Sequence, residues 1–233
     1  MVTGILPAAG AASRFGYLPK YLLPIEERGV TLLDRHVRDL ATTCEEIVIG
    51  VAPPLHELVS RRFQDDLHVE IKSVSSNSFS ETLLELSEFA THDHMILALP
   101  DSVASEVNYQ SFGLPDEDFP LELGVWKCPE GLVGKVGQLE LDQEMELVVA
   151  HADKNPLCEY RFLWGVLKFH KSFLSLVNPS EDSLARAIDA CLARYGPQKA
   201  FLFAGEYMDC GTLKSYFQAI ASVNAAEKWG ELG

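Results

Sequence analysis

The sequence lacks the features of several large classes of protein. Its five cysteines are widely and irregularly spaced and form no C-x-x-C pair, which argues against a zinc site or a disulfide framework. No run of about 18 apolar residues occurs, and no basic segment precedes the short apolar run at the N-terminus. These absences argue against a membrane span and a signal peptide, and they favour a cytoplasmic protein with reduced thiols.

Positive charge is also scarce. The 233 residues include 19 lysines and arginines against 34 aspartates and glutamates, which gives a net charge of −15. Nucleic acids and anionic membranes are bound by clustered Lys and Arg side chains, so a general partner of either kind is disfavoured. An anionic small-molecule substrate would have to be held by a few local cations and a metal ion.

Several catalytic signatures are missing. The chain has no G-x-x-x-x-G-K-[ST] phosphate loop, no dinucleotide-binding glycine fingerprint and no G-x-S-x-G around a serine. The segment Asp101-Ser102-Val103 lacks the second aspartate of a D-x-D motif. A P-loop kinase, a dinucleotide-dependent enzyme, a serine hydrolase and a metal-dependent glycosyltransferase are therefore disfavoured.

What is present is an alternation of strand-like and helix-like segments in a chain that is 47% hydrophobic, enough for one α/β core. In the first half we expect strands at 2–6, 46–51, 69–74 and 95–99, with helices at about 31–43, 53–63 and 81–89 between them. In the second half we expect short strands at 121–127, 136–141, 147–150 and 163–169, then helices at about 180–195 and 212–226. The expected helix caps are Thr31, Ser80, Ser180 and Thr212.

The most informative segment is the N-terminal apolar run, which stops sharply at a loop of small residues that includes Ala8, Ala9 and Gly10. Such a run fits a buried parallel strand. The small side chains leave the backbone N–H groups open to a phosphate. Arg14 and Lys20 follow within ten residues of Gly10. Arginine suits a bidentate phosphate contact and lysine a point contact, although both residues could be ordinary surface cations.

This loop resembles the L-x-A-G-x-G-x-R and P-K-x-x-x-P motifs of the sugar-1-phosphate nucleotidyltransferases, and three later segments are similar to that family's motifs in the same order. They are 97–101 (LALPD), then 137–142 (GQLELD) with 153–156 (DKNP), and 207–212 (YMDCGT). The resemblance spans roughly residues 2–220. It is carried by the order of the four matches rather than by any one of them.

The resemblance implies a fold, a reaction and a cofactor. The fold would be a three-layer, Rossmann-like and GT-A-like α/β domain, with a mixed, mostly parallel sheet and helices on both faces. It would form a single domain over 1–233, with a nucleotide-binding part at about 1–110 and an acceptor-binding part at about 111–233. The reaction would transfer a nucleoside monophosphate from a nucleoside triphosphate to a sugar-1-phosphate, with Mg²⁺ as cofactor and pyrophosphate as the leaving group.

The resemblance also assigns the catalytic and metal-binding residues. Arg14 would hold the β- and γ-phosphates, and Lys20 would contact the α-phosphate and the pyrophosphate bridge. Asp101 and Asp209 would bind the magnesium ion, which prefers oxygen ligands. Asp101 follows a buried strand, and open α/β folds bind their ligands at that edge of the sheet. A turn or cap is the alternative role for each aspartate.

Within the nucleotide-binding part, Ala8, Ala9 and Gly10 would contact the triphosphate. Asn77 and Thr82 lie in the serine-rich segment 75–82, which leads into the third expected helix and matches the segment where the family contacts the base. Asn77 could instead close a turn.

Within the acceptor-binding part, Lys154 would bind the acceptor phosphate and Asp153 would accept hydrogen bonds from sugar hydroxyls. Gly137 and Gly165 match positions where the family lets the sugar ring approach the backbone. Each glycine could instead ease a bend in its strand.

Three departures from the family pattern leave other functions open. Residues 11–13 (AAS) replace the family's second glycine, Asn155 interrupts the E-K-P segment, and residues 75–82 lack a glycine. One alternative is a cytidylyltransferase for a non-sugar phosphate, such as an alcohol or polyol phosphate. Another is a catalytically inactive regulator that binds a nucleotide or nucleotide-sugar.

Overall fold

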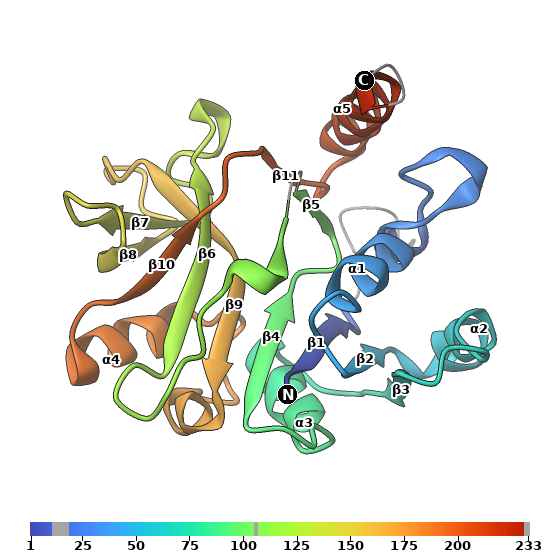
Figure 1. Cartoon of the computed structure of the whole chain (residues 1–233), viewed down its shortest axis with the longest axis horizontal. Helices are drawn as coiled ribbons and strands as arrows, with labels where there is room; N and C mark the ends of the chain where they lie inside the picture. The colour runs from blue at the N-terminus through green and yellow to red at the C-terminus, as the bar shows by residue number, and fades with distance from the viewer. Residues whose placement is uncertain (11–18, 105–106, 231–233) are drawn as a thin grey trace.

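The computed structural model describes residues 1–10, 19–104 and 107–230, with side chains described as far as residue 223. A large mixed sheet carries helices on both faces (Figure 1). The strands are β1 (Thr3–Ala8), β2 (Glu46–Val51), β3 (Val69–Ser73), β4 (His94–Ala98), β5 (Ser102–Ala104), β6 (Leu121–Lys127), β7 (Gly137–Leu141), β8 (Leu147–Asp153), β9 (Phe162–His170), β10 (Gln198–Leu202) and β11 (Tyr207–Asp209). The helices are α1 (Leu32–Leu40), α2 (His56–Arg62), α3 (Phe79–Ser87), α4 (Ala185–Tyr195) and α5 (Leu213–Gly230).

The first half of the chain forms a parallel sheet in which β1 is central. Strand β1 pairs in parallel with β2 and β4, and β2 pairs in parallel with β3. The neighbouring residues Ile5 and Leu6 are fully buried in two different cores, so both faces of β1 are covered. Helices α1 and α2 pack in the core that holds Leu6, and α3 packs in the core that holds Ile5. The predicted mixed α/β fold with a large sheet is confirmed.

The second half extends the same sheet with antiparallel pairs. The nine strands run in the order β3-β2-β1-β4-β9-β6-β10-β8-β7. Strand β7 also pairs with β9, so β9, β6, β10, β8 and β7 close on themselves. Helix α4 packs against β8 and β10 at one side of this closed group (Figure 1).

A separate two-stranded sheet brings distant parts of the chain together. Strand β5 follows β4 almost directly and pairs antiparallel with β11, near the C-terminal end of the chain. Helix α5 then packs through Tyr216 and Ala219 against Ile25 and Leu32. In Figure 1 this small sheet lies between the two halves of the molecule, beside the start of α5.

Two of the four expected helix caps are confirmed. The Thr31 hydroxyl accepts a hydrogen bond from the Asp34 backbone N–H at 3.2 Å, and the Thr31 N–H donates to the Asp34 carboxylate at 2.6 Å. At the start of α5 the Thr212 hydroxyl accepts from the Ser215 N–H at 3.1 Å. Both caps are short-range patterns, which explains why the sequence alone identifies them.

The other two expected caps are wrong. Helix α3 begins earlier than expected, and its cap is Ser78, whose hydroxyl accepts from the Glu81 N–H at 2.9 Å. Ser80 instead donates its backbone N–H to the Glu181 carbonyl at 3.2 Å. Helix α4 begins at Ala185, five residues after Ser180, and has no side-chain cap. Contacts between distant segments decide both starts.

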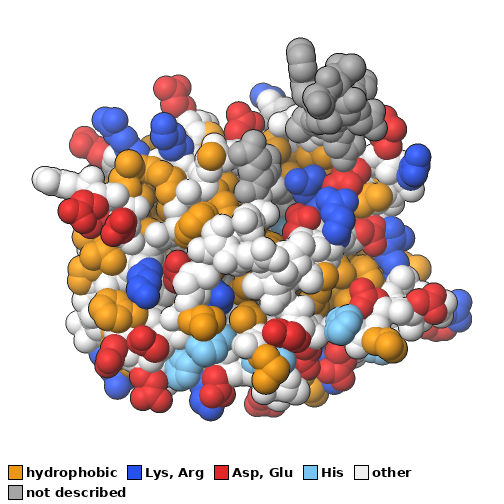
Figure 2. Space-filling model, viewed as in Figure 1, with side chains coloured by type: hydrophobic (Ala, Val, Ile, Leu, Met, Phe, Trp, Pro, Cys, Tyr) orange, Lys and Arg blue, Asp and Glu red, His pale blue; other side chains and the backbone are white. Residues whose placement is uncertain are grey.

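On the face shown in Figure 2, acidic and basic side chains are interspersed rather than separated by sign. All five cysteines are free thiols. Within the described residues, no helix is long and apolar enough to cross a membrane.

Glu26 joins the loop after Lys20 to α1 and gives a testable pH dependence. Its carboxylate accepts two hydrogen bonds from Arg38, both at 2.8 Å, and one from Arg35 at 2.9 Å. The Arg38 hydrogen bond is the main reason that the Glu26 pKa lies below its usual value. A lowered carboxyl pKa stabilises the fold above the unfolded-state pKa of about 4.3, and this contribution is lost as the pH falls through the folded pKa.

We therefore expect Glu26→Gln to lower the free energy of unfolding at pH 7 by about 1 kcal/mol, since Arg38 is half-exposed and solvent screens the pair. The difference from the unmodified protein should be fully present above about pH 4.3 and should shrink as the pH falls below that value. Urea denaturation between pH 7 and pH 3 measures it. Glu27→Gln is the matched control, because Glu27 is exposed and forms no ion pair among the described residues. A difference that is independent of pH would contradict the role given to Glu26.

Candidate active site

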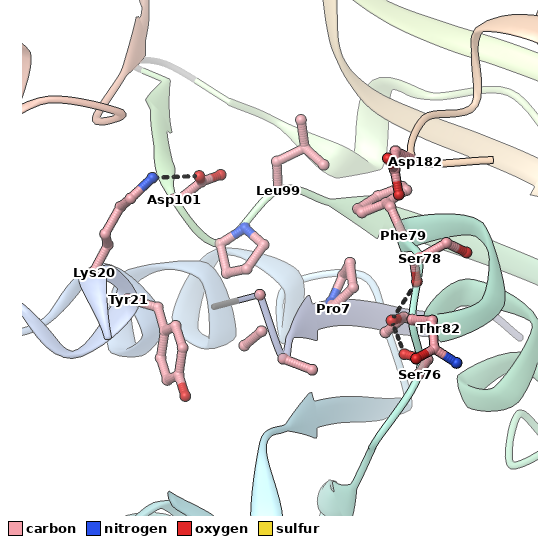
Figure 3. Close-up of a pocket in the computed structure, with 15 residues that line it drawn as sticks. Pro7, Lys20, Tyr21, Ser76, Ser78, Phe79, Thr82, Leu99, Asp101 and Asp182 are labelled. Atoms are coloured by element: carbon pink, nitrogen blue, oxygen red, sulfur yellow. Dashed lines mark hydrogen bonds and ion pairs between the residues drawn. The ribbon is translucent and has the colours of Figure 1, made fainter. Parts of the chain in front are cut away.

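A cavity of about 670 Å³ lies at the carboxyl ends of β1 and β4 (Figure 3). Its walls come from the loop after β1, the short 3-10 helix Lys20–Leu22, the segment before α3, the end of β4 and the segment before α4. The lining residues are Pro7, Ala8, Ala9, Gly10, Lys20, Tyr21, Ser76, Asn77, Ser78, Phe79, Thr82, Leu99, Pro100, Asp101 and Asp182. Open parallel sheets bind their ligands at this edge.

The loop of small residues occupies the place that the sequence predicts. Ala8, Ala9 and Gly10 all line the cavity directly after β1. A Cβ added at Gly10 would meet no atom of the described residues within 4 Å, so those residues leave this part of the wall open to a ligand. Arg14, the other expected phosphate-binding residue of this loop, lies outside the described residues.

Lys20 and Asp101 form an ion pair inside the cavity. The Lys20 Nζ lies 3.2 Å from the Asp101 Oδ2 (Figure 3). The Lys20 side chain is 14% exposed, and that of Asp101 is 47% exposed. The structure thus brings the predicted catalytic lysine and a predicted metal ligand together from positions that are far apart in the sequence.

The two-stranded sheet brings Asp209 close to this pair. Asp209 on β11 lies directly opposite Ser102 on β5, and the Cys210 N–H donates to the Asp101 carbonyl oxygen at 3.1 Å. The backbones of the two aspartates are therefore neighbours, and Asp101 is the one that lines the cavity. A Cβ added at Gly211 would lie 2.9 Å from both Asp209 carboxylate oxygens, so the glycine leaves space beside them.

This donor set fits a magnesium ion that is shared with a phosphate. Magnesium usually binds one or two protein carboxylates together with substrate phosphates and water. No group of three or more His, Cys, Asp or Glu side chains that could enclose a metal occurs within the described residues. Asp101 and Asp209 therefore suit an ion that arrives with a nucleotide better than one held by the protein alone.

The cavity end away from Lys20 is lined by the carboxylate of Asp182 and by neutral polar groups (Figure 3). The Ser76 and Thr82 hydroxyls are hydrogen-bonded to each other, and Thr82 also donates to the Ser78 carbonyl at 2.9 Å. Asn77 lines the cavity as expected, but its backbone N–H also donates to the Glu81 carboxylate at 2.6 Å. Asn77 therefore takes part in a turn and in the cavity wall at once.

Two further groups near the cavity keep their protons at neutral pH. Burial raises the pKa of Tyr21 to about 12, and its hydroxyl has no hydrogen-bond partner among the described residues. Burial, together with the nearby Asp209 and Asp101 carboxylates, raises the pKa of Cys210 to about 12. Cys210 is therefore a buried thiol rather than a nucleophile, because the thiolate is the reactive form.

The expected acceptor residues do not line this cavity. Gly137 and Asp153 lie directly opposite each other on β7 and β8, and Lys154 follows on the exposed surface with a positive φ of 47°. A Cβ at Gly137 would lie 2.5 Å from the Trp164 Nε1. Close packing against the indole is therefore sufficient to explain the glycine.

Gly165 is also explained by packing. It is buried on β9, and a Cβ there would lie 2.3 Å from the Tyr207 Cε2. The tyrosine ring thus occupies the space on the Cβ side of Gly165. The acceptor contact expected at Gly165 stays a prediction.

Sequence reasoning missed Tyr21, Phe79 and Asp182. Tyr21 follows the predicted Lys20, and Phe79 is the first residue of α3, so the motifs that surround them could have identified both. Asp182 lies in an acidic stretch before α4, far from any motif. No signal in the sequence connects it to this cavity.

Comparisons with known proteins agree with this geometry. Residues 4–104 match the MobA-like NTP transferase domain. A protein from Bacillus anthracis that is assigned as a glucose-1-phosphate thymidylyltransferase is similar with a TM-score of 0.79 and 16% identity, over 95% of this chain and 94% of that one. No curated protein shows a significant sequence match.

Two further solved structures are similar over nearly their whole length. The inositol-1-phosphate CTP transferase from T. maritima has a TM-score of 0.76 and 18% identity, over 94% of each chain. The UTP-bound UGPase from Acinetobacter baumannii has a TM-score of 0.72 and 19% identity, over 95% of this chain and 92% of that one.

Identities this low establish a shared fold, whereas the domain match covers β1, Lys20 and Asp101. The predicted resemblance to nucleotidyltransferases is confirmed. Residues 4–104 match the model of the MobA-like NTP transferase domain, and the fold of the chain is similar to that of solved nucleotidyltransferases.

Proposed function

We propose that the protein transfers a nucleoside monophosphate from a nucleoside triphosphate to a sugar-1-phosphate and releases pyrophosphate. The observation that carries this proposal is the ion pair of Lys20 and Asp101 beside the loop of small residues, in one cavity. A triphosphate is bound by a cation and by accessible backbone N–H groups, and its metal ion is bound by a carboxylate. The expected three-layer, Rossmann-like arrangement belongs to the proposal and is supported by helices on both faces of the parallel strands.

In this proposal the nucleotide phosphates lie along the loop of small residues and near Lys20. Asp101 and Asp209 would hold a magnesium ion, which would neutralise charge on the phosphates. Arg14, outside the described residues, keeps its expected place on the β- and γ-phosphates. The protein's contribution is to position the reactants and neutralise charge, because phosphoryl transfers of this kind need little covalent participation from the enzyme.

The acceptor would bind in the part of the chain from about 111 to 233. Lys154 and Asp153 would contact its phosphate and hydroxyls, and Gly137 would lie beside them, as Asp153 pairs with Gly137 in the sheet. We treat residues 1–233 as one domain because both halves share a single sheet. Five free thiols support a cytoplasmic location.

A second candidate is a cytidylyltransferase that uses a polyol phosphate in place of a sugar-1-phosphate. The structural similarity to the inositol-1-phosphate CTP transferase has a TM-score of 0.76. It favours a polyol phosphate as the acceptor as much as the other matches favour a sugar-1-phosphate. The two candidates differ only in the acceptor.

Pyrophosphate release tests both candidates. Each common nucleoside triphosphate would be combined with Mg²⁺ and with sugar-1-phosphates, inositol-1-phosphate and polyol phosphates. We expect turnover with one pair, a requirement for Mg²⁺, and a large loss of rate in Asp101→Asn and Asp209→Asn. Nucleotide binding without turnover for any acceptor would favour the inactive regulator, and neither binding nor turnover would contradict the proposal.

A further inference from the structure

Lys20 and Asp101 have one partner in the structure and a different one in the proposed reaction. The Lys20 Nζ donates to the Asp101 Oδ2 at 3.2 Å (Figure 3). In the proposed transfer, Lys20 would contact a phosphate and Asp101 would hold the magnesium ion. The ammonium group that neutralises Asp101 is therefore the same group that a triphosphate needs.

The backbone around Asp101 is held in place. The Cys210 N–H donates to the Asp101 carbonyl oxygen at 3.1 Å. The buried His36 ring on α1 donates from its Nε2 to the Ser102 carbonyl oxygen at 2.9 Å, and the Ser102 hydroxyl donates to the Leu99 carbonyl oxygen at 2.8 Å. Asp101 is therefore the fixed member of the ion pair.

Lys20 is the member that can move. It begins the short 3-10 helix Lys20–Leu22, and its ammonium has no second hydrogen-bond or ion-pair partner within the described residues. A lysine ammonium sits on a flexible four-carbon stem. Rotation of this side chain can therefore transfer the Nζ from Asp101 to a phosphate in the same cavity without a change in the backbone.

The ion pair discriminates between two forms of a nucleotide. A metal-free triphosphate gains Lys20 only if Lys20 leaves Asp101, and the carboxylate without its cation then repels the phosphates. When the nucleotide arrives with Mg²⁺, Asp101 can exchange the lysine for the metal ion, since carboxylates and phosphates together form a usual magnesium site. One ion pair is then replaced by two favourable contacts.

We propose that the Lys20–Asp101 ion pair makes the cavity select the magnesium complex of a nucleoside triphosphate over the metal-free nucleotide. This inference rests on the proposed nucleotidyl transfer and adds the form of the nucleotide that the site accepts. Asp101 thus has a second role, because it withholds Lys20 from phosphates until another cation takes its place.

Nucleotide binding without metal measures this role apart from catalysis. Asp101→Asn removes the negative charge of the pair and keeps the size of the side chain, so Lys20 becomes available to phosphates. Calorimetric titrations in EDTA with ATP, CTP, GTP, UTP and dTTP would be made on the unmodified protein, Asp101→Asn, Lys20→Ala and the double variant.

We expect Asp101→Asn to bind at least one metal-free nucleotide about fivefold or more tightly than the unmodified protein. In the Lys20→Ala background the same replacement should tighten binding by about twofold or less. That smaller effect is the loss of the repulsion between Asp101 and the phosphates alone, because no lysine is released.

Asp182→Asn is the matched control. It also removes a carboxylate from the cavity wall, but from the end away from Lys20 (Figure 3). Any gain in metal-free binding should be the same in the unmodified and the Lys20→Ala backgrounds, because Asp182 forms no ion pair with Lys20. The comparison separates the release of Lys20 from a general decrease in negative charge.

The possible outcomes separate the inference from the function on which it rests. An equal gain from Asp101→Asn in both backgrounds, or no gain, would overturn the inference and leave the transferase intact, since binding and turnover of magnesium nucleotides test that function separately. Failure of every nucleotide to bind, with and without Mg²⁺, would overturn both. Thermal unfolding shows whether each variant is folded, and Asp101→Ala repeats the measurement if Asp101→Asn does not fold.

Discussion

Replacement of Lys20 by alanine is expected to lower the rate of pyrophosphate release by about 10²–10³, because removal of one preorganised electrostatic contact typically has an effect of this size. Lys20 carries the positive charge among the described residues that line the cavity. In a chain with a net charge of −15, little other positive charge is available to hold a triphosphate. A charge pair at about 4 Å in a partly screened site contributes on the order of 4 kcal/mol before desolvation.

The same variant should fold almost normally. Its partner Asp101 is 47% exposed, so water can solvate the carboxylate when the lysine is removed. Lys214→Ala is the matched control, since Lys214 is exposed on α5 and outside the cavity. Steady-state rates and thermal unfolding of both variants and of Lys20→Arg test the prediction. A near-normal rate for Lys20→Ala would show that Lys20 has no catalytic role.

The parallel half of the fold could be predicted because its signals are local. Each of its central strands is a short apolar run that is buried on both faces, and such runs are visible in one sequence. The segments expected at 2–6 and 46–51 became β1 at Thr3–Ala8 and β2 at Glu46–Val51. The chemistry at the ends of β1 and β4 could be predicted for the same reason, since Lys20 and Asp101 lie in motifs next to these runs.

The two-stranded sheet could not be predicted. Strands β5 and β11 have three residues each, which is too short for an alternating pattern, and residues 105–206 lie between them in the sequence. Yet this pairing is what brings Asp209 next to Asp101. The resemblance to a known motif identified Asp209, whereas only the fold shows where its backbone lies.

Asp182 illustrates a second limit of the sequence. Its place at the cavity depends on hydrogen bonds between the segment before α4 and the start of α3, which lie far apart in the sequence. The same contacts explain the wrong prediction for Ser80, whose N–H donates to Glu181 instead of starting a helix. One tertiary contact thus changed both a helix boundary and the composition of the site.

Gly165→Ala is expected to destabilise the protein by about 1–3 kcal/mol, the usual result of inserting a methyl group into a packed core. The added Cβ would lie 2.3 Å from Tyr207 and 3.0 Å from Trp126. Tyr207 is buried, and its ring packs on Trp126 with centroids 5.4 Å apart. Trp126 in turn stacks on Phe203 at 4.6 Å, so the rings have little room to yield.

Urea denaturation of Gly165→Ala and Gly131→Ala measures this effect, and the second variant is the matched control. A Cβ at Gly131 meets no atom within 4 Å, and Gly131 has no positive φ, so its replacement should change stability by less than about 0.5 kcal/mol. If Gly165 serves only the acceptor, its variant would keep full stability and show a raised KM for the acceptor alone. If it serves packing, the free energy of unfolding falls. The Mg²⁺ concentration needed for half-maximal activity rises as well, because Tyr207 shares β11 with Asp209.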